Sequence, residues 1–342
     1  MPEIVSGQSP EAIDRAVSLI NSGALVGLPT ETVFGLAADA DNPEAVAKVF
    51  VAKGRPADHP LIVHLGADDL LTYYARDIPD DAWALAEAFW PGPLTMILKK
   101  STKVLDVVTG QQETVGLRMP GHPVALALLR ALAESKRRAG LPGGGLAAPS
   151  ANRFGRISPT TAHHVADELG DSVALILDGG DCRVGIESTI VDLSRGAPVI
   201  LRPGAITAEQ LSLVLGRTVR EQVVKEETSP RVSGSLASHY APRTPLQVVD
   251  IVTLAKEMAR GDVAAIVRDT EEVQPLVRQH ASMRVLANDP AAYAHDFYRV
   301  LRELDEGGYR QILVQGLPQH PDWCAIQDRL GRAAHRDLPD NA

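Results

Sequence analysis

The stretch from Lys53 to Leu65 constrains the fold most, because it joins a helical pattern directly to an apolar run through a stiff cationic turn. Gly54 permits a positive φ or a close backbone approach, whereas Pro56 and Pro60 each fix φ. The turn therefore predicts a rigid loop that presents Lys53 and Arg55 to an anion. From this stretch alone, a solvated basic turn without a ligand remains an equal alternative.

Short apolar runs alternate with helical patterns on both sides of this turn. Ser9-Pro10 and Asn42-Pro43 begin helices, and Pro91-Gly92-Pro93 ends another helix. A further helix is expected from a Ser158 cap to Leu169, and 135–145 reads as a mobile surface insertion. Strands are expected at 24–28, 61–64, 94–98, 114–117, 146–148, 174–177, 188–192, 199–201, 247–251, 263–267, 284–286 and 311–315. This alternation predicts an α/β protein.

The chain has 342 residues, which favours two domains because single cores rarely grow beyond about 250 to 300 residues. The stretch 218–245 is charged and then rich in Ser, Gly and Pro, which is typical of a linker. We predict a first domain over 1–207, a linker over 208–245 and a smaller, mostly parallel, Rossmann-like domain over 246–342.

Charge and hydropathy exclude several function classes. The net charge of −9 and the pI near 5.6 disfavour binding to DNA and to anionic membranes. No apolar run approaches the roughly 20 residues of a membrane span, and the N-terminus lacks a signal-peptide pattern. The chain is therefore expected in the cytoplasm. Walker A, G-x-S-x-G and H-E-x-x-H sequences are absent, and the G-x-G-x-x-A match at 143–148 precedes a strand instead of following one.

Polar residues gather where the apolar runs end. Alone, His64 would be an ordinary core histidine, Arg118 a surface cation and Ser150 a turn former. Together they predict one cavity for phosphates and a carboxylate, because strand ends of one sheet converge. The members of this set are Thr30, Glu31, Thr32, Lys53, Arg55, His64, Arg118, Ser150, Asn152, Ser188, Thr189 and Arg202.

Several of these segments resemble the motifs of the YrdC-like threonylcarbamoyladenylate synthases. The similarity covers about residues 5–207, and the His239-Tyr240-Ala241-Pro242 stretch with the βα region behind it resembles the longer, two-domain form. The matching segments are Leu28-Pro29-Thr30-Glu31-Thr32-Val33-Phe34-Gly35-Leu36, Lys53-Gly54-Arg55-Pro56, Pro60-Leu61-Ile62-Val63-His64, Trp90-Pro91-Gly92-Pro93-Leu94-Thr95, Gly116-Leu117-Arg118-Met119-Pro120, Ala148-Pro149-Ser150-Ala151-Asn152, Glu187-Ser188-Thr189-Ile190-Val191-Asp192 and Arg202-Pro203-Gly204.

The resemblance implies a twisted mixed sheet around a cationic cavity, with the linker folded over it. It also implies a reaction in which L-threonine, bicarbonate and Mg-ATP give threonylcarbamoyl-AMP and pyrophosphate. A separate transferase complex then uses the product to modify the adenosine next to the anticodon of tRNA. No protein side chain is expected to ligate the metal.

The resemblance also implies roles for individual residues. Lys53, Arg55, Ser150 and Asn152 form the catalytic and nucleotide-binding set. L-Threonine or its carbamate is assigned to Thr32, His64, Arg118, Ser150 and Ser188. Further contacts to ATP are assigned to Thr114, Thr160, Arg202 and Tyr240, and to His59, which stands where the family usually has Asn.

Two other functions compete with this prediction. One is a YrdC-like module that binds structured RNA without catalysis, which the acidic charge disfavours. The other is a carbamoyl-transfer domain of the hydrogenase-maturation type, which would bring zinc-finger cysteines. The chain has only Cys182 and Cys324.

Overall fold

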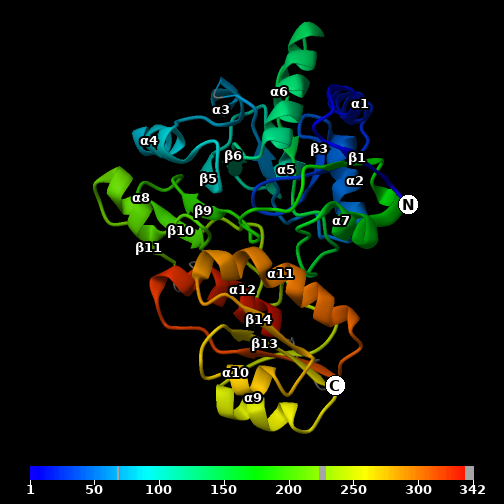
Figure 1. Ribbon diagram of the computed structural model, residues 1–342. Helices are drawn as coiled ribbons and strands as arrows, with labels where there is room; N and C mark the ends of the chain where they lie inside the picture. The colour runs from blue at the N-terminus through cyan, green and yellow to red at the C-terminus, as the bar shows by residue number, and fades with distance from the viewer. Residues whose placement is uncertain (68, 223–228, 336–342) are drawn as a thin grey trace, which may run out of the picture. The chain divides into compact units, whose positions relative to one another are not determined.

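The computed structural model describes residues 1–67, 69–222 and 229–335, which divide into two compact units (Figure 1). The first unit comprises 1–154, 159–183 and 187–235, and the second comprises 155–158, 184–186 and the chain from 236 onward. Residues 223–228 of the predicted linker and 336–342 of the predicted second domain lie outside the described residues. The rest of the predicted linker is divided between the two units.

The first unit is built on one mixed sheet. Its strand order is β1-β8-β2-β3-β7-β4-β6-β5-β9-β10-β11. The strands are β1 (Glu3–Ser6), β2 (Val26–Leu28), β3 (Gly35–Asp39), β4 (Ile62–His64), β5 (Leu94–Lys99), β6 (Thr114–Arg118), β7 (Leu146–Ala147), β8 (Leu175–Asp178), β9 (Thr189–Asp192), β10 (Val199–Arg202) and β11 (Arg220–Glu221).

Helices cover both faces of this sheet and bury two apolar cores. Helices α1 and α6 lie side by side over one core, which includes Ile20 and Leu128 (Figure 1). The second core includes Phe34, Val46 and Leu85. The helices of this unit are α1 (Pro10–Asn21), α2 (Pro43–Lys53), α3 (Asp69–Tyr74), α4 (Asp80–Phe89), α5 (Asp106–Thr109), α6 (Pro123–Arg138), α7 (Ala162–Leu169) and α8 (Ala208–Leu215), with a 3₁₀ turn at Gly170–Ser172.

Helix α2 explains how the cationic turn is held. Asn42 caps its N-terminus by accepting hydrogen bonds from the N–H groups of Glu44 and Ala45. Gly54 ends the helix in the left-handed conformation, with φ 61°. Because a Cβ atom at Gly54 would meet nothing within 4 Å, the glycine is required for this φ and not for a close approach.

The second unit contains a parallel sheet with the strand order β12-β15-β13-β14. Helices α9 and α10 lie on one face of this sheet, and α11 and α12 lie on the other (Figure 1). The elements are β12 (Leu246–Val249), α9 (Ile251–Met258), β13 (Val263–Arg268), α10 (Gln274–Val277), β14 (Met283–Leu286), α11 (Pro290–Glu306), β15 (Gln311–Gln315), a 3₁₀ turn at Pro321–Trp323 and α12 (Cys324–Ala334). The two sheets confirm the predicted α/β class.

Several boundaries differ from the predictions. The apolar pattern did not reveal β1, β3 or α3. Helix α7 begins at Ala162 with Thr161 as its cap, so the predicted Ser158 cap is wrong. Helix α6 continues to Arg138, so the first part of the predicted insertion is helical. The Lys136 ammonium explains this extension, because it pairs with the buried Asp39 carboxylate of β3 and anchors the last turn.

Candidate active site

The site begins where two neighbouring parallel strands end. His64 closes β4 and Arg118 closes β6, and the two residues are direct register partners. Both side chains are buried. The parallel pairing therefore brings an imidazole and a guanidinium together, as the sequence predicted for these two positions.

The loop after β2 supplies a hydroxyl and a carboxylate to Arg118. Nη1 of Arg118 donates a hydrogen bond to Oγ1 of Thr32 over 2.9 Å. Nη2 lies 2.8 Å from Oε1 of Glu31, and each of these two side chains is only 5% exposed. Burial raises the pKa of the Glu31 carboxyl, but the Arg118 charge and hydrogen bonds outweigh it and leave the pKa below its usual value. Glu31 is therefore ionised at neutral pH and orients Arg118.

The His64 ring is uncharged at neutral pH. Burial, reinforced by the nearby Arg118 charge, lowers its pKa to about 3. A neutral imidazole can donate one hydrogen bond and accept another. His64 can therefore position a hydroxyl or an amine without adding a further positive charge.

A second cluster lies where β5 and β9 begin and β10 ends. Oγ of Ser188 is 2.8 Å from Oγ1 of Thr95. Nη2 of Arg202 donates to Oγ of Ser188 over 3.1 Å and to its carbonyl oxygen over 2.9 Å. All three side chains are buried. This cluster presents hydroxyls beside a fixed cation.

Ser233 joins Arg55 and Arg202, two of the three arginines described for the candidate site. Its carbonyl oxygen accepts a hydrogen bond from Nη1 of Arg202 over 2.9 Å, and its Oγ accepts one from Nη2 of Arg55 over 3.2 Å. Arg55 also donates to the carbonyl oxygen of Pro60 over 2.8 Å. Ser233 belongs to the predicted linker, so this part of the linker lies against the first unit's cations.

Lys53 is held differently. Its ammonium donates to the carbonyl oxygens of Ser150 and Asn152, each over 2.5 Å. The side chain is 3% exposed. Burial, together with the charge of Arg55, lowers its pKa well below the usual lysine value. A bound anion would favour the charged form of Lys53, which is the property expected of a side chain that binds phosphate.

The remaining predicted residues are His59, Thr114, Thr160 and Tyr240. The His59 ring lies 5.2 Å from the Phe154 ring, and the Arg55 guanidinium lies 5.8 Å from the same ring. Thr114 lines a small hollow with Pro60, Gly116 and Ser233, and Thr160 is buried. Tyr240 belongs to the second unit, where its ring is 5.9 Å from that of Tyr298. Its predicted contact with a nucleotide stays a prediction.

The reason for the clustering differs from the predicted one. Strand β7, which leads to Ser150, is antiparallel to β4, so Ser150 and His64 leave the sheet at opposite ends. A shared strand edge therefore does not bring all these residues together. Thr95, Phe154 and Ser233 had no predicted role, and Glu31 was expected only as a member of the cavity set, without its pairing to Arg118. Thr95 and Glu31 lie inside quoted motifs, which was the available signal.

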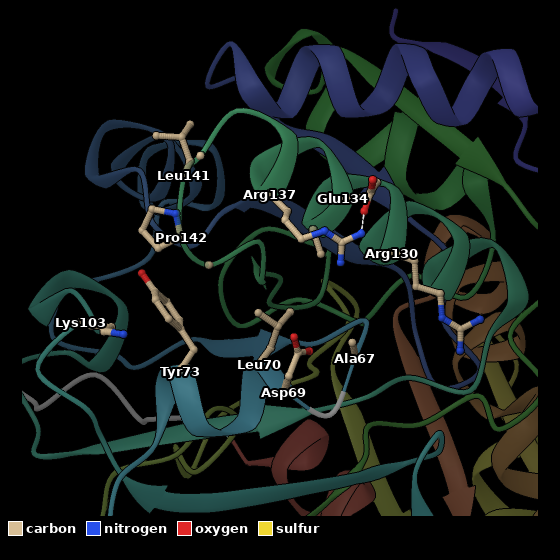
Figure 2. Close-up of a pocket in the computed structure, with 13 residues that line it drawn as sticks. Ala67, Asp69, Leu70, Tyr73, Lys103, Arg130, Glu134, Arg137, Leu141 and Pro142 are labelled. Atoms are coloured by element: carbon tan, nitrogen blue, oxygen red, sulfur yellow. Dashed lines mark ion pairs between the residues drawn. The ribbon is translucent and has the colours of Figure 1, made fainter.

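A large hollow of the first unit lies elsewhere. It has a volume of about 830 Å³ and is lined by α3, α6 and the loop 140–143 (Figure 2). Tyr73 and Leu70 point into it from α3, and Arg137 borders it from α6 (Figure 2). None of the predicted site residues lines it. The candidate active site is therefore the buried polar network described above and not this hollow.

Two searches of the described residues gave negative results. No group of three or more His, Cys, Asp or Glu side chains within 1–67, 69–222 and 229–335 could hold a metal ion. No helix in the same ranges has both the length and the apolar character needed to cross a bilayer.

Comparison with known proteins places the chain in a family. The model for Sua5, YciO and YrdC proteins, described as "Telomere recombination", matches residues 18–204, and the model described as "Threonylcarbamoyl-AMP synthase, C-terminal domain" matches 206–335. The chain is 37% identical to a threonylcarbamoyl-AMP synthase of Pyrococcus abyssi over 93% of each chain. It is 38% identical to that of Bacillus subtilis over 94% of this chain and 92% of the relative.

A solved structure agrees with the sequence relatives. The crystal structure of P. abyssi Sua5 complexed with L-threonine matches with a TM-score of 0.85 and 35% identity, covering 98% of this chain and 97% of the other. Both the sequence and the fold are therefore shared over almost the whole length. The chain belongs to the threonylcarbamoyl-AMP synthase family.

Proposed function

We propose that the chain condenses L-threonine, bicarbonate and ATP to threonylcarbamoyl-AMP and pyrophosphate. The observation that carries this proposal is the burial of Lys53, Arg55, Arg118 and Arg202 with hydroxyl groups in one unit of a family member. Charges of this number are rarely buried unless a ligand or partner compensates them. A substrate with three phosphates and a carboxylate would interact favourably with such a set of cations.

The threonine end of the reaction is assigned to Arg118 and its neighbours. Arg118 would bind the threonine carboxylate, with Glu31 and Thr32 fixing its guanidinium, and with His64 and Ser188 reaching the rest of the substrate. The neutral His64 suits an uncharged amine or hydroxyl. The threonine amine nitrogen forms a bond to the carbon of CO₂ derived from bicarbonate and loses a proton, which gives a carbamate.

The nucleotide end is assigned to the lysine and the remaining arginines. A carbamate oxygen attacks the α-phosphorus of ATP, and the bond from that phosphorus to the bridging oxygen breaks, which releases pyrophosphate. Lys53 and Arg55 would stabilise charge on the phosphates, and Ser150 and Asn152 would orient them. His59, Thr114, Thr160, Arg202 and Tyr240 would make the other nucleotide contacts. No side chain needs to act as a nucleophile, because positioning and charge neutralisation are sufficient.

Mg²⁺ is proposed to enter with ATP, on the pyrophosphate leaving group. The product is proposed to pass to a separate transferase complex that modifies tRNA, and the cytoplasm is the proposed location. The linker is proposed to cover the nucleotide, and the Ser233 contacts to Arg55 and Arg202 support this role.

Enzymatic activity is favoured over the RNA-binding alternative. The full-length relatives are named as synthases, and the four candidate-site cations Lys53, Arg55, Arg118 and Arg202 are buried instead of lying on an exposed basic surface. Polyanion binding needs exposed charge that contacts the backbone phosphates.

The test measures pyrophosphate release from Mg-ATP with threonine and bicarbonate, and repeats it with each component omitted. Release that requires all three supports the proposal. Release without threonine would contradict it. So would a protein that binds tRNA in a salt-dependent way but releases no pyrophosphate.

A further inference from the structure

The second unit contains a polar cluster at the place where parallel α/β sheets bind ligands. Strands β15 and β13 are neighbours, and the connections that leave them go to opposite faces of the sheet (Figure 1). Helix α10 follows β13 on one face, and α12 follows β15 on the other. This arrangement is a topological switch point, where small molecules typically bind beyond the carboxyl ends of the strands.

Arg268 and Gln315 are the last residues of these two strands. The backbone N–H of Arg268 donates to Oε1 of Gln315 over 2.9 Å, which ties the two strand ends together. Nη1 of Arg268 donates to Oδ1 of Asn288 over 2.7 Å, beyond the end of β14. The guanidinium is therefore fixed in place by one of its edges.

Three hydrogen-bond donors beside this position lack acceptors. Nε of Arg268, Oγ1 of Thr270 and the hydroxyl oxygen of Tyr293 are buried and have no hydrogen-bond partner among the described residues. A buried donor without an acceptor is energetically unfavourable, so an arriving acceptor would stabilise each of these groups. The Tyr293 side chain is fully buried, so solvent does not reach its hydroxyl in this conformation.

Trp323 brings Arg268 and Tyr293 together. The Arg268 guanidinium lies 5.8 Å from the centre of the Trp323 ring, and the Tyr293 ring lies 5.4 Å from the same ring. Burial raises the pKa of the Tyr293 hydroxyl, so it stays protonated and can donate. Arg268 and Tyr293 thus place one cation and one hydroxyl donor beside the same ring. Thr270, two residues after Arg268, adds a second hydroxyl donor that also lacks an acceptor among the described residues.

We propose that Arg268, Thr270 and Tyr293 bind the oxyanion group of a small molecule, a phosphate or a carboxylate. The free Nε edge of a guanidinium fits two oxygens of either group, and hydroxyls supply the further hydrogen bonds. The neighbouring acids do not occupy this position. Asp269 accepts a hydrogen bond from the Gln274 amide, and Asp289 caps α11 by accepting from the N–H of Ala292.

This site is separate from the proposed synthase reaction and does not depend on it. The proposed active-site cations Lys53, Arg55, Arg118 and Arg202 all belong to the first unit, whereas Arg268, Thr270 and Tyr293 belong to the second. An anion site here would give the second unit a binding function of its own. Failure of either proposal would leave the other intact.

The test uses the full-length protein with fluorine-labelled tryptophan and inorganic phosphate or acetate as probes, with chloride keeping the ionic strength constant. The chain has three tryptophans, Trp83, Trp90 and Trp323. Trp83 and Trp90 report on anions bound by the first unit, and Trp323 reports on the second. We expect a saturable change of the Trp323 resonance in ¹⁹F NMR. Comparison of the two probes decides between a phosphate and a carboxylate.

Two variants and one control test the assignment. Arg268→Gln should weaken the response of Trp323 by about tenfold or more, and Tyr293→Phe should weaken it several-fold. Tyr293→Phe removes one oxygen from a packed ring, so it preserves folding if Arg268→Gln does not. Arg284→Gln is the control, because Arg284 lies on the same sheet but pairs with Glu303. It should leave the response unchanged.

Three outcomes would overturn the inference. The first is no saturable change of Trp323 with either anion. The second is an undiminished response in both Arg268→Gln and Tyr293→Phe. The third is a higher melting temperature of Tyr293→Phe with an unchanged anion response, which would show that the Tyr293 hydroxyl serves no ligand.

Discussion

The two units treat their buried cations differently. In the second unit, Arg329 is fully buried and Nη1 lies 2.7 Å from the carboxylate of the adjacent Asp328. In the first unit, Lys53 is almost as buried, but its ammonium donates to the carbonyl oxygens of Ser150 and Asn152, and the Glu168 charge raises its pKa less than burial lowers it. Arg329 is therefore in contact with a full negative charge, whereas Lys53 is in contact with the partial negative charges of carbonyl oxygens.

This difference distinguishes a structural charge from a functional one. A buried pair with its own counter-ion is complete without a ligand, whereas a buried ammonium on neutral acceptors gains most when an anion arrives. The first unit therefore keeps an unbalanced charge where the nucleotide phosphates are proposed to bind. Arg118 is intermediate, because it pairs with the Glu31 carboxylate and also donates to neutral oxygens of Thr32 and Gly92.

The largest expected effect comes from removing the unbalanced charge. Lys53→Met should lower kcat/KM for ATP by about tenfold to a hundredfold, because a charge-assisted contact contributes about 1.5 to 3 kcal/mol. The control is Lys48→Met, because Lys48 lies on the same helix and also donates to a carbonyl oxygen, that of Gly23. Steady-state pyrophosphate release measures both. Equal losses in the two variants would remove the distinction between Lys53 and an ordinary helix lysine.

A smaller effect is expected from Glu31→Gln. The amide keeps the shape but loses the charge that orients Arg118, so KM for threonine should rise about tenfold while KM for ATP changes little. Glu44→Gln on α2 serves as the control, since Glu44 is exposed. A lower KM for threonine in Glu31→Gln would mean that the carboxylate competes with the substrate instead of positioning Arg118.

Because His64 is neutral in the folded protein, the free energy of unfolding should decrease as the pH falls. The unfolded histidine takes up a proton near its ordinary pKa of 6.5, but the folded one does so only near 3. The contribution of His64 to the free energy of unfolding is therefore complete above pH 6.5 and declines by up to about 1.4 kcal/mol per pH unit below it. Denaturant unfolding of wild type and His64→Gln between pH 5 and 7 measures this. Identical slopes would show that His64 has the same pKa in the folded and unfolded states.

The smallest expected effect is a change in the alkaline limb of the pH profile. The pKa of Lys53 is lowered, so its charge is lost at a lower pH than that of an exposed lysine, and ATP binding weakens as that charge disappears. Lys53→Arg keeps its positive charge at alkaline pH. Its kcat/KM for ATP should therefore decline less toward alkaline pH than that of wild type, by a factor of about a few. A steeper decline in the arginine variant would contradict this account.

Much of the architecture followed from local patterns. The helices at Pro10–Asn21 and Pro43–Lys53 have a cap residue, a proline at the first position and an apolar face, and local rules suffice for such elements. Strand β3 was missed because Gly35–Asp39 has no alternation, being buried on both sides. Its identity as a strand depends on antiparallel pairing with β2 and with β7. Strand β7 lies far along the chain, so a local pattern does not reveal this pairing.

For the candidate site, the residue types were readable from the sequence and their geometry was not. Glycine at the end of α2, the cations beside it and the polar residues after apolar runs all follow from intrinsic conformational and chemical preferences of these side chains. The antiparallel course of β7, the ion pair of Glu31 with Arg118 and the contact of Ser233 with two arginines depend on long-range packing. Such packing is decided by the burial free energy of the complete sheet and its helices, which no short stretch of the chain contains.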